Sequence, residues 1–152
     1  MTPVFLRRLT RTVLGIAAIL TVTMAARPAA VTEIVVYKSP TCGCCTKWVE
    51  YLRKQGFTVV SHDTSGMTAV KADLGVPDAM ASCHTAMVGG YVIEGHVPAA
   101  DIQRLLKEHP KVVGLSVPGM VTGSPGMEGG TPEHYKVLAF DAKGATTVFS
   151  SY

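Results

Sequence analysis

The feature that most constrains the fold of this chain is a cluster of three cysteines between a short apolar run and an amphipathic segment. Cys42, Cys44 and Cys45 lie within four consecutive positions. The run before them, residues 34–37, is β-branched and aromatic and has the length of a buried strand. Behind them, apolar residues between positions 48 and 57 recur at the spacing of one helix face. The cysteines are therefore predicted to lie on a strand-to-helix turn.

The start of a helix is a favourable place for an anion. Its first backbone N–H groups lack partners within the helix, and the positive end of the helix dipole adds to their effect. A thiolate is such an anion, so we expect lowered pKa values for the sulfurs of this turn. Thiols of this kind are reactive or bind metals.

The length and charge of the chain limit the classes of function. Its 152 residues, 47% hydrophobic and 16% charged, suit one domain. The net charge of +3 depends on Arg7, Arg8 and Arg11, because the first 26 residues contain no acid. From Ala26 onward, 11 basic residues balance 11 acidic ones. Nothing in this neutral balance indicates a nucleic-acid partner.

Residues 1–26 have the pattern of a secretory signal peptide. The three arginines precede an apolar stretch, residues 13–24, and the small residues Ala25 and Ala26 follow it. Twelve apolar residues are too few to span a membrane comfortably, so we predict cleavage and no stable membrane span. Cleavage is expected near Ala26, with a second option near Ala30. In a bacterium with two membranes, the exported protein would be in the periplasm.

The order of the predicted elements indicates the fold class. Further strands are predicted at residues 58–63, 84–88 and 91–93, and helices at residues 67–74 and after Pro98. With the first strand and helix, the order is β-α-β-α-β-β-α. This order predicts an α/β domain of the thioredoxin-like fold, which we place at residues 31–152.

The end of the chain differs from the rest. Residues 111–132 are rich in glycine and proline, and two short strands after them predict a C-terminal β-hairpin. An irregular loop of this length in a compact domain is either functional or disordered. Met120 and Met127 occur in matching Pro-Gly-Met contexts, which favours a functional loop.

The cysteines of the turn allow more than one chemistry. Cys42 and Cys45 form a C-x-x-C pair, which is typical of dithiol–disulfide exchange. A third thiol, Cys44, would invite wrong pairings in an exchange enzyme, whereas metal binding explains all three sulfurs. Structural disulfides are a further alternative.

The fourth cysteine, Cys83, precedes the predicted third strand. In a thioredoxin-like domain, this point meets the start of the first helix, so we expect all four sulfurs to converge. Cys83 follows Cys45 by 38 positions, so only the fold could bring the two together. The alternative is that Cys83 is a small buried residue without a role in the site.

Thiolate ligands favour soft metal ions such as Cu(I). Three sulfurs on one turn crowd a mononuclear Zn(II) site but suit a polynuclear Cu(I) cluster with bridging thiolates. Met120 and Met127 could add thioether ligands, with core packing as the alternative for both. His84, next to Cys83, could be a ligand or a hydrogen-bond donor to one, and His96 is considered on the same grounds. The candidate metal ligands are Cys42, Cys44, Cys45, Cys83, Met120, Met127 and His84.

Four short motifs along the chain form a pattern of their own. In order, they are Tyr37-Lys38-Ser39-Pro40-Thr41-Cys42-Gly43-Cys44-Cys45, Ser82-Cys83-His84-Thr85, Glu94-Gly95-His96-Val97-Pro98-Ala99 and Gly123-Ser124-Pro125-Gly126-Met127. Together they resemble the CopG family of exported bacterial metal-binding proteins, over about residues 32–140. The resemblance implies a thioredoxin-like domain that binds copper through the four cysteines. It also implies a redox-active carrier that interconverts Cu(I) and Cu(II).

Three hypotheses follow. The first is a periplasmic copper-binding protein that sequesters or relays Cu(I) in copper resistance, with other periplasmic copper-handling proteins as partners. The second is a thiol–disulfide oxidoreductase of thioredoxin-like fold. The third is a structural zinc or disulfide domain that acts through its surface. Redox activity is compatible with the first two, so the sequence leaves open whether the protein is an enzyme.

Overall fold

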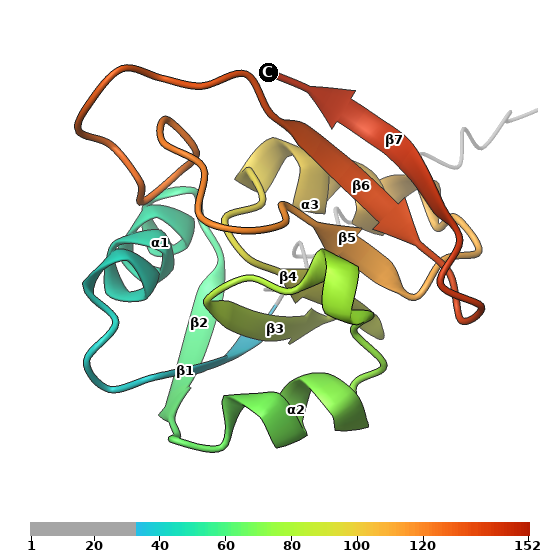
Figure 1. Ribbon diagram of the computed structural model, residues 1–152, viewed down its shortest axis with the longest axis horizontal. Coiled ribbons are helices and arrows are strands. Elements are labelled where there is room, and N and C mark those ends of the chain that lie inside the picture. Colours follow the sequence, from blue (N-terminus) through green and yellow to red (C-terminus); the bar gives the residue numbers. More distant parts are fainter. Residues whose placement is uncertain (1–32) are drawn as a thin grey trace, which may run out of the picture.

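A mixed β-sheet runs through the molecule, which is shown in Figure 1 as a computed structural model that describes residues 33–152. The strands are β1 (Glu33–Lys38), β2 (Thr58–Asp63), β3 (His84–Val88), β4 (Tyr91–Glu94), β5 (Gly114–Ser116), β6 (Lys136–Phe140) and β7 (Thr146–Ser151). The helical elements are α1 (Gly43–Lys54), α2 (Met67–Asp73), the 3-10 turn η1 (Asp78–Met80) and α3 (Ala99–Glu108).

The strand order in the sheet is β2-β1-β3-β4-β5-β6-β7. β1 pairs in parallel with β2 and antiparallel with β3, and β4 pairs in parallel with β5. The remaining neighbours are antiparallel. The register of β1 against β3 places Lys38 opposite His84, so the end of β1 lies beside the start of β3. The segments that follow β1 and precede β3 therefore meet at one end of the sheet.

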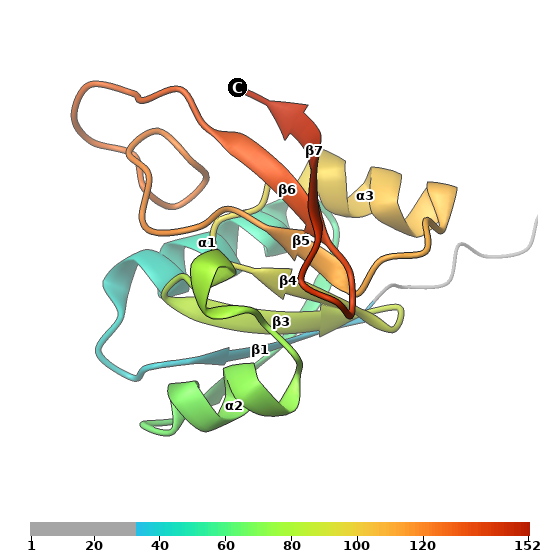
Figure 2. The ribbon, with the colours of Figure 1, turned by 45° about the vertical axis from the view of Figure 1, so that its right-hand side comes forward.

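Helices cover both faces of the sheet (Figure 2). The larger core cluster joins α1 and α3 to one face, through residues such as Trp48 and Ile102. The smaller cluster lies on the other face, near the end of α2 and η1, and includes Met80, Val92 and Phe140. Successive side chains of a strand point to opposite faces, so neighbouring residues in β3 and β4 belong to different environments.

The element order predicted from the sequence is confirmed, from β1 to α3, with η1 as an addition. The C-terminal hairpin is also confirmed, as β6 and β7. The sequence reading missed β5, which is only three residues long and lies in the Gly/Pro-rich stretch. β5 joins β4 to β6, so the hairpin extends the central sheet and does not form a separate unit. The structure is a mixed α/β domain, and its assignment as thioredoxin-like stays a prediction.

The chain between β5 and β6, residues 117–135, is irregular and is called the Gly/Pro loop below. Figure 1 shows it passing over the start of α1. The predicted signal peptide, residues 1–26, lies outside the described residues. Within residues 33–152, no helix has the length and apolar character needed to cross a membrane.

Candidate metal centre

The cysteine turn lies where the sequence predicts it, at the start of α1. Cys42 is the residue that precedes the helix, and Cys44 and Cys45 belong to its first turn. Cys45 is buried, whereas Cys42 and Cys44 are half-buried. The Cys42 side chain makes no capping hydrogen bond, so the helix start is not occupied by a side-chain oxygen.

Cys42 and Cys45 form a disulfide, with their Cα atoms 5.4 Å apart. Cys44 and Cys83 are free, and Cys44 Sγ lies 3.4 Å from Cys42 Sγ. The disulfide is the C-x-x-C pair recognised in the sequence. In this state two of the four sulfurs can act as thiolates, and reduction of the bond would make all four available.

The four cysteine sulfurs converge, as the sequence predicts. The sulfurs of Cys42, Cys44, Cys45 and Cys83 all lie within 4.8 Å of one another. The cause is the pairing of β1 with β3, which brings the residue before β3 beside the turn that follows β1. The role of these residues as metal ligands stays a prediction.

The Cys83 thiol differs from the thiols expected at a helix start. Burial, and after it the neighbouring Cys44, raise the pKa of the Cys83 thiol to about 12. At neutral pH Cys83 is therefore protonated in the metal-free protein. A metal ion that binds there must displace this proton.

Two histidines face Cys83. Cys83 Sγ lies 3.2 Å from His84 Nδ1 and 3.1 Å from His96 Nε2. These three ligand atoms also lie within 4.8 Å of one another. We call Cys83, His84 and His96 the sulfur–imidazole cluster. His84 was a candidate from the sequence, and His96 reaches the same point through the turn after β4.

Both imidazoles are fully buried and neutral. Burial lowers the pKa of His84 well below its usual value, with further lowering by His96 and Lys71. Burial likewise lowers the pKa of His96, although the hydrogen bond to Pro125 acts in the opposite direction. The His84 ring lies against Trp48, with ring centroids 4.3 Å apart. Its Nε2 atom has no hydrogen-bond partner in the part of the chain that the structure describes. Neutral imidazole is the form that binds metals.

A glycine makes the turn that places His96. Gly95 has φ of +71°, and a Cβ atom there would lie 2.5 Å from Ser82 Oγ and 2.6 Å from the Val117 carbonyl. Its N–H donates to the His84 carbonyl at 3.0 Å. Because the backbone turns so tightly at Gly95, His96 comes back towards Cys83.

The Gly/Pro loop contacts the site at two points. A Cβ atom on Gly126 would lie 2.8 Å from Trp48 N and 3.0 Å from the Cys44 carbonyl oxygen, so the loop backbone packs directly on α1. Gly119 pairs with Ser82, whose hydroxyl donates to the Gly119 carbonyl. Met127 and Met120 follow these two glycines; Met127 is half-buried and Met120 is 58% exposed. The proposed contact of either thioether with a metal stays a prediction.

A second buried polar cluster lies on the other face of β3 and β4. The carboxylate of Glu94, which is fully buried, accepts hydrogen bonds from Lys71 Nζ, from Ser82 N–H (2.6 Å) and from Thr85 Oγ1 (2.7 Å). Lys71 also donates to Thr85 Oγ1 at 3.0 Å. We call Lys71, Ser82, Thr85 and Glu94 the ion-pair cluster. The sequence gives one signal for it, an acidic residue at the end of an apolar strand.

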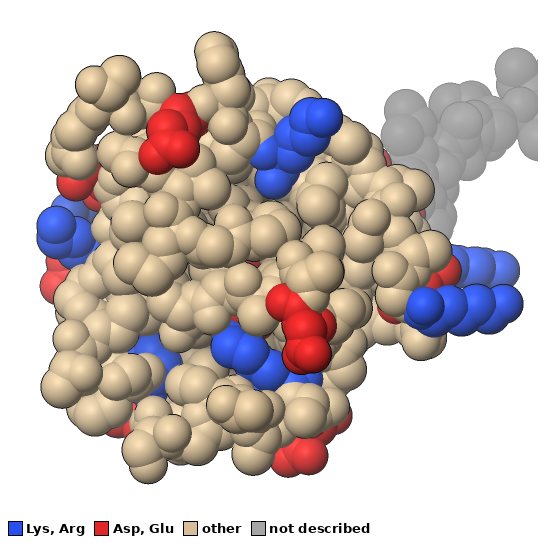
Figure 3. Space-filling model, in the orientation of Figure 1, with Lys and Arg blue, Asp and Glu red and all other residues tan. Residues whose placement is uncertain are grey.

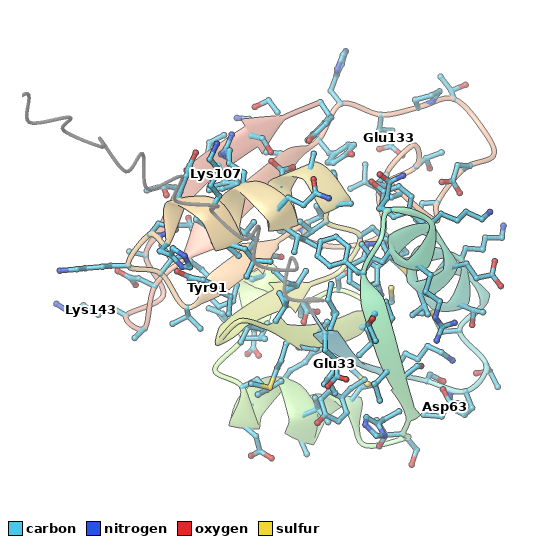
Figure 4. All side chains as sticks on the ribbon, turned by 180° about the vertical axis from the view of Figure 1, so that it is seen from behind. Glu33, Asp63, Tyr91, Lys107, Glu133 and Lys143 are labelled. Atoms are coloured by element: carbon cyan, nitrogen blue, oxygen red, sulfur yellow. A yellow bond between two sulfur atoms is a disulfide. The ribbon has the colours of Figure 1, made fainter. Side chains whose placement is uncertain are left out.

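Figure 4 shows side chains filling the space between the helices and the sheet. On the face shown in Figure 3, lysine, arginine and acidic residues are scattered, and they form no continuous basic surface there.

The chain is similar to known proteins in one part of its sequence and over most of its fold. Residues 80–127 match the family described as DUF411, a protein of unknown function. Two solved structures, described as copper resistance protein CopG in form 2 and form 1, are each 45% identical to this chain. The first has a TM-score of 0.76 and covers 80% of this chain and 98% of that chain. The second has a TM-score of 0.75 and covers 79% of this chain and 96% of that chain. The search of curated proteins finds no match.

Proposed function

Since the chain belongs to the CopG family of copper resistance proteins, we propose that it binds Cu(I) and sequesters or relays it. The observation that carries this proposal is the convergence of Cys42, Cys44, Cys45 and Cys83 within 4.8 Å. Four sulfurs at this spacing suit a soft ion better than a hard one.

The copper-binding form is the reduced protein. An external dithiol reduces the Cys42–Cys45 disulfide by thiol–disulfide exchange: the dithiol is oxidised to its own disulfide, and its two electrons and two protons yield the two cysteine thiols, so that four cysteines become available. With three sulfurs on one helix turn, thiolates can bridge neighbouring ions, and the bound copper would form a polynuclear Cu(I) cluster. The Cys83 proton leaves when copper binds.

The remaining candidate ligands have supporting roles in this proposal. At least one of the two methionines supplies a neutral thioether over the cysteine turn, and half-buried Met127 is the better candidate than Met120, which is 58% exposed. His84 is a ligand or donates a hydrogen bond to Cys83. The closeness of Gly126 to Cys44 and of Gly119 to Ser82 supports a site that the Gly/Pro loop covers.

The site of action follows from the N-terminal sequence. We propose that residues 1–26 direct export to the periplasm and that the mature domain is thioredoxin-like. Other periplasmic copper-handling proteins would then deliver or receive the ion. The strand order β2-β1-β3-β4, with α1 and α3 on one face, supports this fold assignment.

An anaerobic competition experiment tests the copper proposal. The fully reduced protein is titrated with Cu(I) in the presence of a Cu(I) chelator and, separately, of Zn(II). We expect Cu(I) to displace Zn(II), and Cys83→Ser to weaken Cu(I) binding by about tenfold or more. Thr46→Ala, on the same helix turn but without a sulfur, is the control and should leave binding unchanged. Equal or stronger retention of Zn(II) would contradict the proposal.

A second candidate function is thiol–disulfide exchange, which the Cys42–Cys45 disulfide favours. In this case Cys44 would be dispensable. The variant Cys44→Ser should then reduce insulin disulfides as fast as the unchanged protein. Under the copper proposal, the same variant binds less Cu(I) per chain, and both proteins reduce insulin slowly.

A further inference from the structure

The sulfur–imidazole cluster offers a different set of donor atoms from the cysteine site. It shares only Cys83 with the group of four sulfurs. His84 and His96 are both fully buried, so neither serves as a surface group. A Cu(I) site built from four thiolates does not need two imidazoles, and their presence requires its own explanation.

The three donor atoms are close to the spacing that one metal ion requires. Bond lengths of about 2.3 Å to sulfur and about 2.0 Å to nitrogen place ligand atoms about 3.5 Å apart in a tetrahedral site. The sulfur lies 3.1 Å from His96 Nε2 and 3.2 Å from His84 Nδ1. These two distances would lengthen by a few tenths of an ångström when an ion enters, and the third, between the two imidazole nitrogens, lies within 4.8 Å.

The orientation of His96 is fixed as in a metal ligand. His96 Nδ1–H donates to the Pro125 carbonyl at 2.8 Å, so the neutral ring presents the lone pair of Nε2 to Cys83. A backbone carbonyl on the far nitrogen is the usual partner of a metal-binding histidine. The carbonyl belongs to the Gly/Pro loop, which gives this loop a part in the cluster.

His84 provides a second, independent observation. Within residues 33–152, its Nε2 atom is buried without a hydrogen-bond partner, and its Nδ1 atom lies 3.2 Å from Cys83 Sγ. A buried polar atom without a partner costs stability, by about 1–3 kcal/mol. Packing against Trp48 would be served as well by an apolar side chain. The imidazole directs its Nδ1 atom at Cys83 Sγ, which indicates that the ring serves an ion bound at this sulfur.

The donor types identify the class of ligand. One thiolate and two neutral imidazoles suit divalent ions of the Cu(II) and Zn(II) kind, whereas a set made mainly of thiolates and thioethers selects Cu(I). While Cys42 and Cys45 are joined in the disulfide, they cannot act as thiolates, but Cys83 is free. Cys44 is the other free sulfur and lies within 4.8 Å of Cys83 Sγ.

We propose that the disulfide form of the protein binds one divalent transition-metal ion through Cys83, His84 and His96, with Cys44 as the nearest donor for a fourth position. This inference extends the proposed Cu(I) function, because Cys83 would serve both sites. The two sites therefore exclude each other. The oxidation state of Cys42 and Cys45 then decides whether the centre takes a divalent ion or Cu(I).

The experiment uses the disulfide-bonded chain and Co(II) as the probe, because Cu(II) oxidises free thiols. We expect one Co(II) per chain, with thiolate-to-cobalt charge-transfer absorption and the visible bands of a four-coordinate ion. His96→Ala and Cys83→Ser should each weaken binding by about tenfold or more. His62→Ala, which removes a ring stacked on Tyr37 away from the cluster, should leave binding unchanged.

A measurement without substitutions covers the case in which buried histidine variants do not fold. In the Co(II) protein, the ring protons of two histidines should appear as strongly shifted NMR resonances. The absence of Co(II) binding, with Cu(I) binding by the reduced protein intact, overturns the inference but leaves the proposed function standing. Co(II) binding without shifted histidine resonances, or unaffected in a folded His96→Ala variant, also overturns it. Loss of both metals contradicts the inference and the proposed function together.

Discussion

The two buried polar clusters at the start of β3 and the end of β4 lie on opposite faces of the sheet and differ in how their hydrogen bonds are satisfied. In the ion-pair cluster, the Glu94 carboxylate accepts from three donors, and Lys71 has two acceptors. In the sulfur–imidazole cluster, His84 Nε2 has no hydrogen-bond partner within the described residues, and His84 Nδ1 lies 3.2 Å from Cys83 Sγ. The two clusters are built from neighbouring positions of the same strands, and alternation along β3 sends His84 and Thr85 to opposite faces.

This difference distinguishes residues that stabilise the fold from residues whose polar atoms are available to bind a ligand. A buried network stabilises a structure only when all of its members are satisfied. The ion-pair cluster meets this condition and fixes Ser82, the residue before Cys83. The sulfur–imidazole cluster does not meet it, and sites of function are where such exceptions are expected.

The largest effect is expected from Glu94→Ala. This change leaves the Lys71 ammonium, which is 15% exposed, without its buried partner, and we expect the free energy of unfolding to fall by about 3 kcal/mol. Urea unfolding of the metal-free protein measures it. The double variant Lys71→Met with Glu94→Leu removes both charges and should recover only the part of the loss that comes from the unpaired ammonium, because Ser82 N–H and Thr85 Oγ1 still lose their acceptor. If Glu94→Ala costs under about 1 kcal/mol, the ion-pair cluster does not have the structural role assigned to it.

Gly126→Ala tests how tightly the Gly/Pro loop packs on the cysteine turn. Gly126 has φ of +86°, and a Cβ atom would lie 2.8 Å from Trp48 N. We expect a stability loss of about 2 kcal/mol or more, from backbone strain and the clash together, and weaker Cu(I) binding. Gly129→Ala is the matched control, since φ is +113° but no atom lies within 4 Å of the added Cβ. If Gly126→Ala and Gly129→Ala lower the thermal unfolding temperature equally, the contact between the Gly/Pro loop and the cysteine turn does not contribute to stability.

For His84→Phe and His84→Leu we expect the opposite effect on stability, an increase in the free energy of unfolding. Either removes a buried nitrogen without a partner, and the better-packed of the two should raise the free energy of unfolding by about 1 kcal/mol. The same variants should no longer bind Co(II) in the disulfide form. A protein made more stable and less able to bind metal would sharpen the contrast between the two clusters. Substantial destabilisation by both changes would show that His84 is structural.

Local features of this chain were predictable from sequence, and so was one long-range feature, the approach of Cys83 to the cysteine turn. The cysteine turn depends on a strand pattern and a helix pattern that are adjacent in the chain. The convergence of Cys83 with this turn followed from the order of elements. β5 could not be recognised, because three residues within a Gly/Pro-rich stretch give no periodic signal.

In the site too, contacts between residues far apart in the chain could not be predicted from sequence. Nothing in the sequence ties Glu94 to Lys71, 23 positions earlier, because the partnership arises only when α2 packs on the sheet. The position of His96 in the site also could not be predicted from sequence. The turn at Gly95 directs His96 towards Cys83, and the carbonyl of Pro125, 29 positions away, fixes the orientation of its ring. Ligand types could be predicted from composition, but their orientation required the tertiary structure.

The smallest effect concerns a third polar contact, between Tyr152 and Asp101, in which both groups are satisfied. Tyr152 Oη donates to Asp101 Oδ2 at 2.8 Å, and burial together with this hydrogen bond raises the pKa of Tyr152 to about 12. A raised pKa means that the unfolded state loses its proton first as the pH rises. The contribution to stability is therefore complete below about pH 10 and is lost as the pH approaches about 12. Because Tyr152 is 47% exposed, solvent screens the contact, and the change in stability should be small.

Tyrosinate absorbance during an alkaline titration measures the pKa of Tyr152, and Asp101→Asn should lower this pKa by removing the neighbouring charge. If Tyr152 titrates near pH 10 in the unchanged protein, the hydrogen bond to Asp101 is not maintained in solution. In that case the rule that satisfied clusters stabilise the fold would apply to the buried ion-pair cluster but not to this half-exposed contact.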